Sequence, residues 1–384
     1  MTGREIRILV TGGGTGGHVT PALAVVQTLR EMARGADWTP CFRYVGSAQG
    51  VEARLAAEAG IEFVGVQSGK LRRTALFSRR NLGDALRVPV GILQSLAAVR
   101  RFRPDVVLAT GGYVSVPPVV AAGLLGRPVL IHEQTVQVGL ANRIAARFAR
   151  RIALTFEGAL ADLPPNLRAK AFVTGNPVRA VLFAGNRARA VARFGFSVND
   201  DTLPTVYITG GAQGAQVINR AVEAVLPELL AGCRIIHQCG AQGLDSLQAA
   251  ARGLPPELGR RYFVTGFIGE EIGDVFALAD LVVGRSGAGT VTEAAATGKP
   301  ALFIPLVPTG GDEQTRNARR SAGAGAAVIV PQAELDGPRL LSEVRALLAD
   351  SERRRRMGEA AQTLARPQAA RDLARALLEL TRVS

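Results

Sequence analysis

The amino-acid sequence predicts an α/β protein built from two halves, each folded around a parallel β-sheet. Short apolar runs of strand length alternate along the chain with segments of helical apolar spacing. The order of strand, glycine loop and helix begins at residues 6–10 and begins again, about half a chain later, at 205–208. The chain has 384 residues, which suggests two or three domains. Its 44 glycines and 5% aromatic content favour the tight turns of an α/β protein over an aromatic-rich β-sandwich.

Apolar runs define the strands, and glycines and prolines define the turns between them. In the first half we predict strands at 6–10, 41–45, 63–66, 106–109, 129–131, 152–154 and 171–173. In the second half we predict them at 205–208, near 235 and 263, and at 281–283, 301–304 and 327–330. Helices are predicted at 22–29, at 51–59, from about 217 and in the amphipathic tail 366–384. The join between the halves is predicted at 175–179, where Gly and Pro interrupt the pattern.

Composition narrows the class of protein. The formal net charge is +14, and 43 of the 46 cationic residues are arginine. A base-composition bias explains the arginines, and an anionic partner explains the charge; both explanations stay open at this point. Three scattered cysteines, Cys41, Cys233 and Cys239, favour a reducing compartment without disulfides. We expect no signal peptide, no membrane-spanning segment and no metal, since the run at 234–239 is typical of a buried strand rather than a zinc site.

Three glycine loops follow strands, at 12–17, 111–113 and 210–214. The first has the dinucleotide-binding spacing G-x-G-x-x-G, but the second strand ends at 44–47 without the acid that would bind a ribose. A nicotinamide cofactor is therefore disfavoured. Glycines also let backbone N–H groups approach a phosphate at a helix start, so three loops indicate more than one phosphorylated ligand. The alternative is that some of these glycines only form tight turns.

Two further segments carry polar groups to helix starts. His18 directly follows the first glycine loop, where it could transfer a proton or simply cap the helix. Ser286 and Gly287 begin a helix that could bind a diphosphate, and Glu293 in that helix could accept both ribose hydroxyls or only favour the helix dipole. In the following polar segment, Gln314 or Asn317 could bind sugar hydroxyls, or the segment could only cap a helix.

Residues 69–103 form a basic segment with nine cationic residues and one acid, Asp84. Leucines, valines and Phe77 lie between the charges, a mixture typical of a segment at an anionic lipid surface. The alternative is a solvated helix face. Nucleic-acid binding is disfavoured, because Phe77 and Phe102 are the only aromatic residues available for stacking.

Six motifs in a fixed order point to one family. They are GGGTGGHVTP at 12–21, GGYVS at 111–115, HEQ at 132–134, GNPVR at 175–179, GGAQGA at 210–215 and RSGA at 285–288. With these motifs nearly the whole chain resembles the undecaprenyl-diphospho-muramoylpentapeptide N-acetylglucosaminyltransferases, the lipid II synthases of bacterial peptidoglycan assembly. The resemblance implies a GT-B fold, two Rossmann-like parallel-sheet domains facing across a cleft.

The resemblance also implies an activity and a separate role for each domain. GlcNAc would move from UDP-GlcNAc, with inversion, to the C4 hydroxyl of undecaprenyl-diphospho-MurNAc-pentapeptide (lipid I). Residues 1–178, completed by the helix at 366–384, would form the acceptor- and membrane-facing domain, and 179–365 the donor domain. No cofactor is implied. The implied partners are UDP-GlcNAc, lipid I, the anionic cytoplasmic membrane surface, where the protein would be peripheral, and other cell-wall synthesis and division proteins.

Site residues follow from the same resemblance. The base would be His18, with Glu133 as helper or rival. The donor contacts would be Thr15, Gly16, Gly17, Thr135, Arg179, Ala212, Ile268 by its backbone, Ala288, Gly289, Thr290, Glu293 and Gln314. The acceptor diphosphate would face Gly13, Gly14, Gly112 and Tyr113. The membrane contacts would be Lys70, Arg72, Arg73, Leu76, Phe77, Arg79 and Arg80.

Two departures from the family pattern concern the donor sugar. The family usually has Asn where this chain has Thr135, so an amide is replaced by a hydroxyl. It often has Ser where this chain has Ala212, although the backbone N–H is kept. Two other functions stay open: a related enzyme for another UDP-sugar or glycolipid acceptor, such as a sugar 2-epimerase, and a non-catalytic lipid- or nucleic-acid-binding protein, which UDP would not stabilise.

Overall fold

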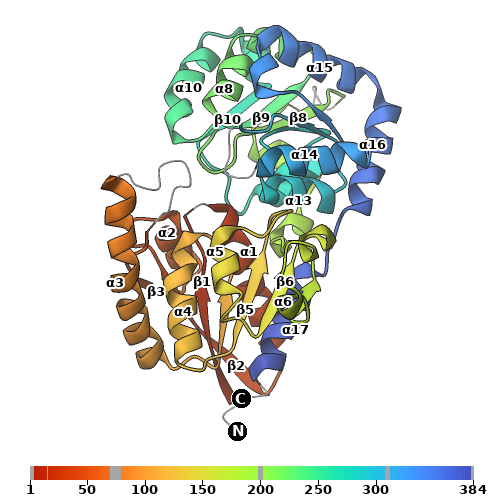
Figure 1. The fold of residues 1–384 in the computed structure, drawn as a ribbon. Coiled ribbons are helices and arrows are strands. Elements are labelled where there is room, and N and C mark those ends of the chain that lie inside the picture. Colours follow the sequence, from red (N-terminus) through yellow and green to blue (C-terminus); the bar gives the residue numbers. More distant parts are fainter. Residues whose placement is uncertain (1–3, 15, 70–78, 198–201, 308–311, 382–384) are drawn as a thin grey trace. The chain divides into compact units, whose positions relative to one another are not determined.

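The computed structural model describes residues 4–14, 16–69, 79–197, 202–307 and 312–381. By its internal contacts the chain divides into two compact units. Unit 1 is Met1–Arg179 with Arg366–Ser384, and unit 2 is Ala180–Ala365. Each unit contains one parallel sheet with helices packed on it (Figure 1).

Unit 1 has a seven-stranded sheet of order β3-β2-β1-β4-β5-β6-β7. Its strands are β1 (Arg4–Thr11), β2 (Trp38–Gly46), β3 (Glu62–Gly65), β4 (Val106–Ala109), β5 (Val129–Glu133), β6 (Arg151–Leu154) and β7 (Ala171–Val173). Its helices are α1 (Gly16–Ala33), α2 (Val51–Glu58), α3 (Arg79–Phe102), α4 (Val116–Leu124), α5 (Leu140–Ala145), α6 (Pro165–Arg168) and α17 (Ala369–Thr381), with 3₁₀ turns η2 (Tyr113–Ser115) and η3 (Glu157–Leu160).

The sheet of unit 1 is buried on both faces. One core cluster packs side chains of α3, α4 and α5 against the sheet, and includes Phe102, Val119 and Ala145. The other cluster, on the opposite face, packs α1 and α17 against it, with Leu29 and Leu377 fully buried. The predicted tail helix is therefore confirmed, and it completes the core of the unit formed by the beginning of the chain.

Unit 2 has a six-stranded sheet of order β10-β9-β8-β11-β12-β13. Its strands are β8 (Thr205–Thr209), β9 (Arg234–Gln238), β10 (Tyr262–Thr265), β11 (Leu281–Gly284), β12 (Ala301–Phe303) and β13 (Ala327–Ile329). Its helices are α7 (Arg187–Arg193), α8 (Gln216–Glu223), α9 (Leu226–Leu230), α10 (Leu244–Arg252), α11 (Pro256–Gly259), α12 (Ile272–Leu278), α13 (Ala288–Ala296), α14 (Glu313–Gly323), α15 (Gly337–Ala349) and α16 (Ser351–Thr363), with 3₁₀ turns η4 (Ala180–Ala184), η6 (Ala241–Gly243) and η7 (Gln332–Glu334).

Both sheets have the strand order of a Rossmann-like domain, in which the second and third strands lie on one side of the first and the fourth lies on the other. Each predicted strand is present, with ends that shift by a few residues. The largest shift is at β2, which begins at Trp38 because Arg4 pairs with Trp38 in the register with β1. The repeated opening is also real, since Thr11 and Thr209 end the equivalent strands β1 and β8.

A buried carboxylate fastens the first residues of unit 2 to helix α12. Asp274, on α12, is 2% exposed and accepts hydrogen bonds from the Asn186 N–H at 3.0 Å and from the Arg189 guanidinium at 2.6 to 3.0 Å. The Arg189 hydrogen bonds, opposed by burial, hold the pKa of this carboxyl below its usual range. The start of the unit is thereby tied to α12.

A helix at α3 is predicted only as the alternative for the basic segment, because the segment shows charge more clearly than apolar spacing. It contains Pro89 and Gly91, and a Cβ at Gly91 would lie 1.9 Å from the Gln67 carbonyl oxygen. Gly91 thus permits close packing on the chain after β3. No helix in the described ranges is long and apolar enough to cross a bilayer.

We expect Leu377→Ala to lower the free energy of unfolding of unit 1 by about 2–5 kcal/mol, the cost of a cavity at a fully buried leucine. Trp38 is the only tryptophan and packs against the same cluster, so its fluorescence during urea denaturation reports on this unit. Leu378→Ala, at a partly buried position of the same helix, is the matched control and should cost less. Equal losses in both variants would contradict the packing described for α17.

Candidate active site

The carboxyl ends of the central strands position the candidate groups of each unit. In unit 1, β1 and β4 are neighbours, but the helices that follow them, α1 and α4, pack on opposite faces of the sheet. Loops that leave in opposite directions open a crevice at this edge of a parallel sheet, where such folds bind ligands. His18 lies in the first turn of α1, just after the loop that follows β1, and Gly112 and Tyr113 lie where the loop after β4 enters η2.

Thr110 holds His18 at two points. The ring Nδ1 of His18 lies 3.1 Å from the Thr110 carbonyl oxygen, and the Thr110 hydroxyl donates to the His18 carbonyl oxygen at 2.7 Å. Because a carbonyl oxygen only accepts, Nδ1 carries the proton in this hydrogen bond. In the neutral ring the lone pair is then on Nε2. The first turn of α1 therefore carries an imidazole with a fixed ring orientation and a defined basic nitrogen.

The surroundings of His18 favour the neutral ring. Burial lowers its pKa below the usual 6.5, and the negative charge of Glu133, the hydrogen bond to Thr110 and the charge of Glu52 oppose that shift. A neutral imidazole at neutral pH is the form that can take a proton from a hydroxyl.

Glu133, at the end of β5, is 2% exposed and uses both carboxylate oxygens within the protein. Oε1 accepts from the Thr135 N–H at 2.9 Å and the Thr135 hydroxyl at 2.8 Å. Oε2 accepts from the Gly139 N–H at 2.9 Å and the Asn142 amide at 3.0 Å. This arrangement suits a residue that shapes the loop and contributes charge, more than one that receives a substrate proton.

The side chain of Thr135 is part of the same network. Its hydroxyl lies between Glu133 Oε1 and the Gln137 carbonyl oxygen. Its single proton is therefore committed to the loop, although it was predicted to face a donor sugar. Asn142 was not predicted from sequence; it is 3% exposed and also donates to the His132 carbonyl oxygen at 3.3 Å.

The first glycine loop packs tightly on protein neighbours. A Cβ at Gly12 would lie 2.0 Å from Thr110 Oγ1, and one at Gly14 would lie 2.7 Å from the Tyr113 ring. The Gly13 N–H donates to the Gly111 carbonyl oxygen at 3.2 Å. These glycines are thus required by the packing of the loops on each other. Thr15 lies outside the described residues, Gly16 begins α1, and Gly17 is exposed.

Glu52 is a fully buried carboxylate below this loop, and sequence reasoning did not single it out. It accepts from the Ser47 N–H at 3.0 Å and the Gly14 N–H at 3.4 Å. A Cβ at Gly13 would lie 2.6 Å from its carboxyl carbon. Two N–H groups of the predicted phosphate loop, those of Gly13 and Gly14, are therefore engaged within the protein.

Unit 2 presents a more open edge. Gly211, in the loop after β8, has a positive φ of 80°, and a Cβ there, or at Gly287 or Gly289, would meet no atom within 4 Å. Gly287 is the N-cap of α13, whose first turn carries no acidic side chain. The first N–H groups of a helix have no partner within it, so Ala288, Gly289 and Thr290 present donors and a positive dipole end to an anion.

The polar residues around α13 divide into buried and accessible ones. Asn317 is 1% exposed and donates to the Ser286 carbonyl oxygen at 3.1 Å, so it belongs to the framework. Gln314 uses its side-chain oxygen to accept from the Leu306 N–H at 3.0 Å. Glu293 is partly exposed in the second turn of α13. The Ile268 N–H donates to Gln238 Oε1 at 3.0 Å and is engaged within the protein.

The two remaining histidines, His132 and His237, are buried framework residues. Both ring nitrogens of His237 have partners, Tyr262 Oη at 2.9 Å and Asn219 Oδ1 at 3.2 Å, and burial lowers its pKa to about 3. His132 has a pKa lowered to about 4, chiefly by burial. Among the described residues no group of three or more metal-ligating side chains comes together.

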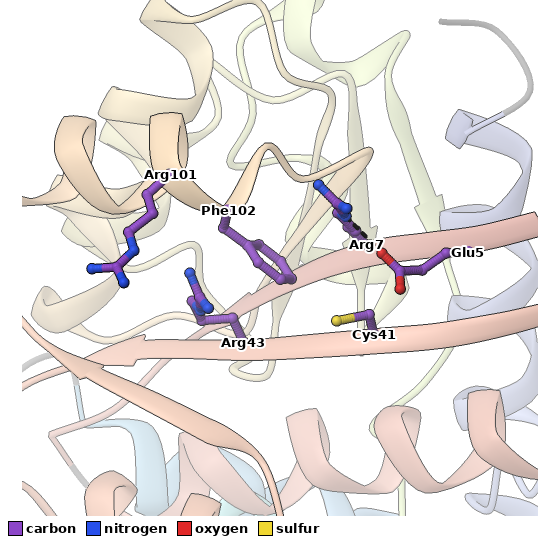
Figure 2. Close-up of a pocket in the computed structure, with 6 residues that line it drawn as sticks. All are labelled: Glu5, Arg7, Cys41, Arg43, Arg101 and Phe102. Atoms are coloured by element: carbon purple, nitrogen blue, oxygen red, sulfur yellow. Dashed lines mark hydrogen bonds and ion pairs between the residues drawn. The ribbon is translucent and has the colours of Figure 1, made fainter.

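A cavity of about 280 Å³ in unit 1 lies away from the candidate edge of its sheet (Figure 2). It is lined by residues of β1, β2 and the last turn of α3. Figure 2 shows the Arg43 side chain beside Phe102, and the guanidinium carbon is 4.6 Å from the ring centroid. Arg43 pairs with Glu62 at 2.5 Å and Arg7 with Glu5 at 2.7 Å. Glu5 and Glu62 therefore offset part of the positive charge that the arginines bring to this cavity.

Comparison with known proteins identifies the family. Residues 8–154 match the glycosyltransferase family 28 N-terminal domain, and residues 205–373 match its C-terminal domain. Among curated relatives, the UDP-N-acetylglucosamine–N-acetylmuramyl-(pentapeptide) pyrophosphoryl-undecaprenol N-acetylglucosamine transferase of Nocardioides sp. is 40% identical and covers 98% of both chains. The enzyme of that name from Lachnospira eligens is 37% identical over 90% of this chain and 91% of its own. The chain belongs to this family of transferases.

Solved structures agree with the family. A crystal structure of Acinetobacter baumannii MurG has a TM-score of 0.69 and 28% identity, with 97% of this chain and 99% of that chain covered. The fold is thus the GT-B fold predicted from the resemblance. A UDP-GlcNAc 2-epimerase from Neisseria meningitidis has a TM-score of 0.65 at 14% identity, over 98% of this chain and 100% of that one. At that identity it shares only the fold, and fold alone does not fix the reaction of a family member.

We expect His18→Ala to lower kcat for sugar transfer by about 10²–10⁴-fold, because a positioned general base is lost. The wild-type rate should fall on the acid side, as His18 takes up a proton below pH 6.5, and the variant should lack this limb. The measurement is kcat against pH with both substrates saturating. A loss confined to the acceptor KM would assign His18 to binding instead.

Glu133→Gln separates the two predicted bases in the same experiment. Removing the negative charge lowers the pKa of His18, so the acid limb should remain and move to lower pH. If instead the limb disappeared in Glu133→Gln and persisted in His18→Ala, the carboxylate would be the base.

Proposed function

We propose that this chain transfers GlcNAc from UDP-GlcNAc, with inversion, to the C4 hydroxyl of lipid I, and so forms lipid II for peptidoglycan synthesis. The observation that carries the proposal is the 37–40% identity to curated transferases of that name over at least 90% of the chain. The presence of both family 28 domains in order supports it.

The donor nucleotide belongs to unit 2 in this proposal. The N–H groups of Ala288, Gly289 and Thr290 bind the diphosphate, because the start of α13 is open and free of acidic side chains. Glu293 accepts the ribose hydroxyls, and Gln314 faces the sugar. The further donor contacts carried over from the family are Gly16, Gly17, Thr15, Thr135, Arg179, Ala212 and Ile268.

The chemical step uses the groups of both units. The acceptor O4 attacks C1 of GlcNAc as the bond from C1 to the UDP oxygen breaks, and the proton of the hydroxyl moves to Nε2 of His18. Negative charge develops on the departing diphosphate, where fixed N–H donors at a helix start stabilise it most. Glu133 keeps the loop after β5 in place and stabilises the imidazolium by its charge.

Acceptor binding belongs to unit 1 in this proposal. Gly13, Gly14, Gly112 and Tyr113 face the acceptor diphosphate. The Gly13 N–H already donates to Gly111, and the Gly14 N–H donates to the Glu52 carboxylate. The other backbone N–H groups of the two loops therefore bind the acceptor diphosphate.

We place the protein at the cytoplasmic face of the membrane as a peripheral protein, where it also meets other cell-wall synthesis and division proteins. In the described part of α3, Val90 and Leu93 are 41% and 67% exposed and lie three residues apart on one helix face, with Arg87 exposed one turn earlier. Of the predicted membrane contacts, Lys70, Arg72, Arg73, Leu76 and Phe77 lie outside the described residues. Arg79 and Arg80 begin α3, and their side chains are not described.

The second candidate, an enzyme for another UDP-sugar, is favoured by the commitment of the Thr135 hydroxyl to Glu133 and Gln137. We expect selective transfer from labelled UDP-GlcNAc, compared with UDP-GalNAc and UDP-glucose, onto a short-chain lipid I analogue. Preferred transfer from either of the other two donors would establish the second candidate.

We expect Glu293→Ala to raise the KM for UDP-GlcNAc at least tenfold and to leave the fold intact, because a hydrogen-bonding pair of hydroxyls loses its charged acceptor. Donor KM is measured at saturating acceptor, with thermal unfolding as the check on folding. Glu343→Ala, on α15, is the matched control. An unchanged donor KM would remove the ribose role from Glu293.

A further inference from the structure

Gln238 lies where the strand order brings three loops together. It is the last residue of β9, the strand between β8 and β10 in the sheet of unit 2 (Figure 1). The register pairs Thr209 with Gln238 and Gln238 with Thr265, so the three residues form one row across the carboxyl edge. On one side of Gln238 is the glycine loop after β8, and on the other is the segment after β10 that contains Ile268.

The side-chain amide of Gln238 bonds to both of these segments. Nε2 donates to the Gly211 carbonyl oxygen at 2.8 Å and to Thr209 Oγ1 at 3.4 Å. Oε1 accepts from the Ile268 N–H at 3.0 Å. Gln238 is 6% exposed, so water competes little for these hydrogen bonds. An amide has a donor end and an acceptor end, and each end has the partner that it requires.

Backbone packing makes the glycine loop dependent on the end of β9. A Cβ at Gly214 would lie 1.9 Å from the Cys239 carbonyl oxygen, and one at Gly240 would lie 2.2 Å from the Gln213 carbonyl oxygen. The Thr209 hydroxyl also accepts from the Gly211 N–H at 3.0 Å. The loop after β8 therefore rests on the residues around Gln238, and a change there reaches Gly211 directly.

We propose that Gln238 is a positioning residue of the donor site: it holds the glycine loop after β8 (210–214) and the segment after β10 that contains Ile268 in one arrangement. It thereby couples binding of the diphosphate, beside the first segment, to binding of the base, beside the second. This rests on the proposed function in taking a uridine diphosphate as the donor nucleotide and in placing it against Ile268 and the loop that contains Ala212. Gln238 does not contact the nucleotide itself; it acts through Gly211 and Ile268.

The test compares uridine and UDP binding to the full chain by calorimetry, in wild type, Gln238→Met and the control Gln248→Met. Gln248 is an exposed residue of α10. Methionine keeps the length of the side chain but leaves the Gly211 carbonyl and the Ile268 N–H without their partner. We expect Gln238→Met to weaken UDP binding by roughly tenfold or more, since two buried hydrogen bonds are lost. Uridine binding should also weaken, but by less, so that the ratio of the uridine Kd to the UDP Kd falls.

A second variant separates the two ends of the amide. Gln238→Glu keeps an acceptor for the Ile268 N–H and loses the donor to Gly211. We expect it to retain uridine binding and to lose most of the affinity that the diphosphate adds. In the transfer assay, Gln238→Met should raise the KM for UDP-GlcNAc more than it changes kcat.

Several results would overturn the proposal. These are unchanged uridine and UDP binding in Gln238→Met, a loss for UDP with uridine unaffected, or equal fold losses for both ligands, because each removes the coupling. If Gln238→Met does not fold, Gln238→Glu takes its place: a fall in the ratio of the uridine Kd to the UDP Kd supports the proposal, and an unchanged ratio overturns it. The proposal on Gln238 and the proposed transferase function can be tested separately. If the wild type binds UDP but transfers no GlcNAc, the transferase function is contradicted and the role of Gln238 stands. If the wild type binds neither uridine nor UDP, the role of Gln238 is overturned.

Discussion

The parallel pairing of β1 with β4, and of β8 with β11, is the constraint on which both candidate sites depend. A parallel strand can be reached only by a crossover, and at these two pairs the crossovers leave the sheet on opposite faces. In unit 1 the two loops that follow these strands pack on each other, and in unit 2 the start of α13 presents backbone donors at the sheet edge. His18 and Thr110 contact each other because the start of α1 and the residue after β4 meet at this edge of unit 1, and Gly211 and Ala288 follow the paired strands β8 and β11 in unit 2.

Similar glycine loops serve different physical purposes in the two units. In unit 1 the missing side chains make room for protein atoms, with Thr110 against Gly12 and the Glu52 carboxylate against Gly13. The result is a rigid support for an imidazole. In unit 2 the glycines at 211, 287 and 289 face open space, and the start of α13 keeps its donors available. In the proposed reaction the imidazole beside the first sheet is the base, and the start of α13 beside the second binds the diphosphate.

Sequence reasoning succeeded where the signal is local. Buried strands such as β4 are continuous apolar runs, and a helix start after glycines is a short-range pattern. It did not find Thr110, Glu52, Asn142 or Gln238, because their importance comes from the register between strands and from partners far along the chain. The family motifs supplied the candidate site residues, and their individual roles stay predictions. For Thr135 and Glu133 the structure adds what a motif cannot, namely that their oxygens already bond to each other and to their own loop.

The return of α17 to unit 1 has a consequence for the order of folding. Unit 2 is continuous in sequence, whereas the core that packs against α1 needs Leu373 and Leu377 from the end of the chain. The Arg4 guanidinium donates to the Thr381 carbonyl oxygen at 3.2 Å, a contact between residues 377 positions apart. During synthesis, unit 2 can bury its core while one face of the first sheet is covered by α1 but still lacks α17. Unit 1, although it is made first, is therefore the last to be completed, and its contacts of high sequence separation slow that final step.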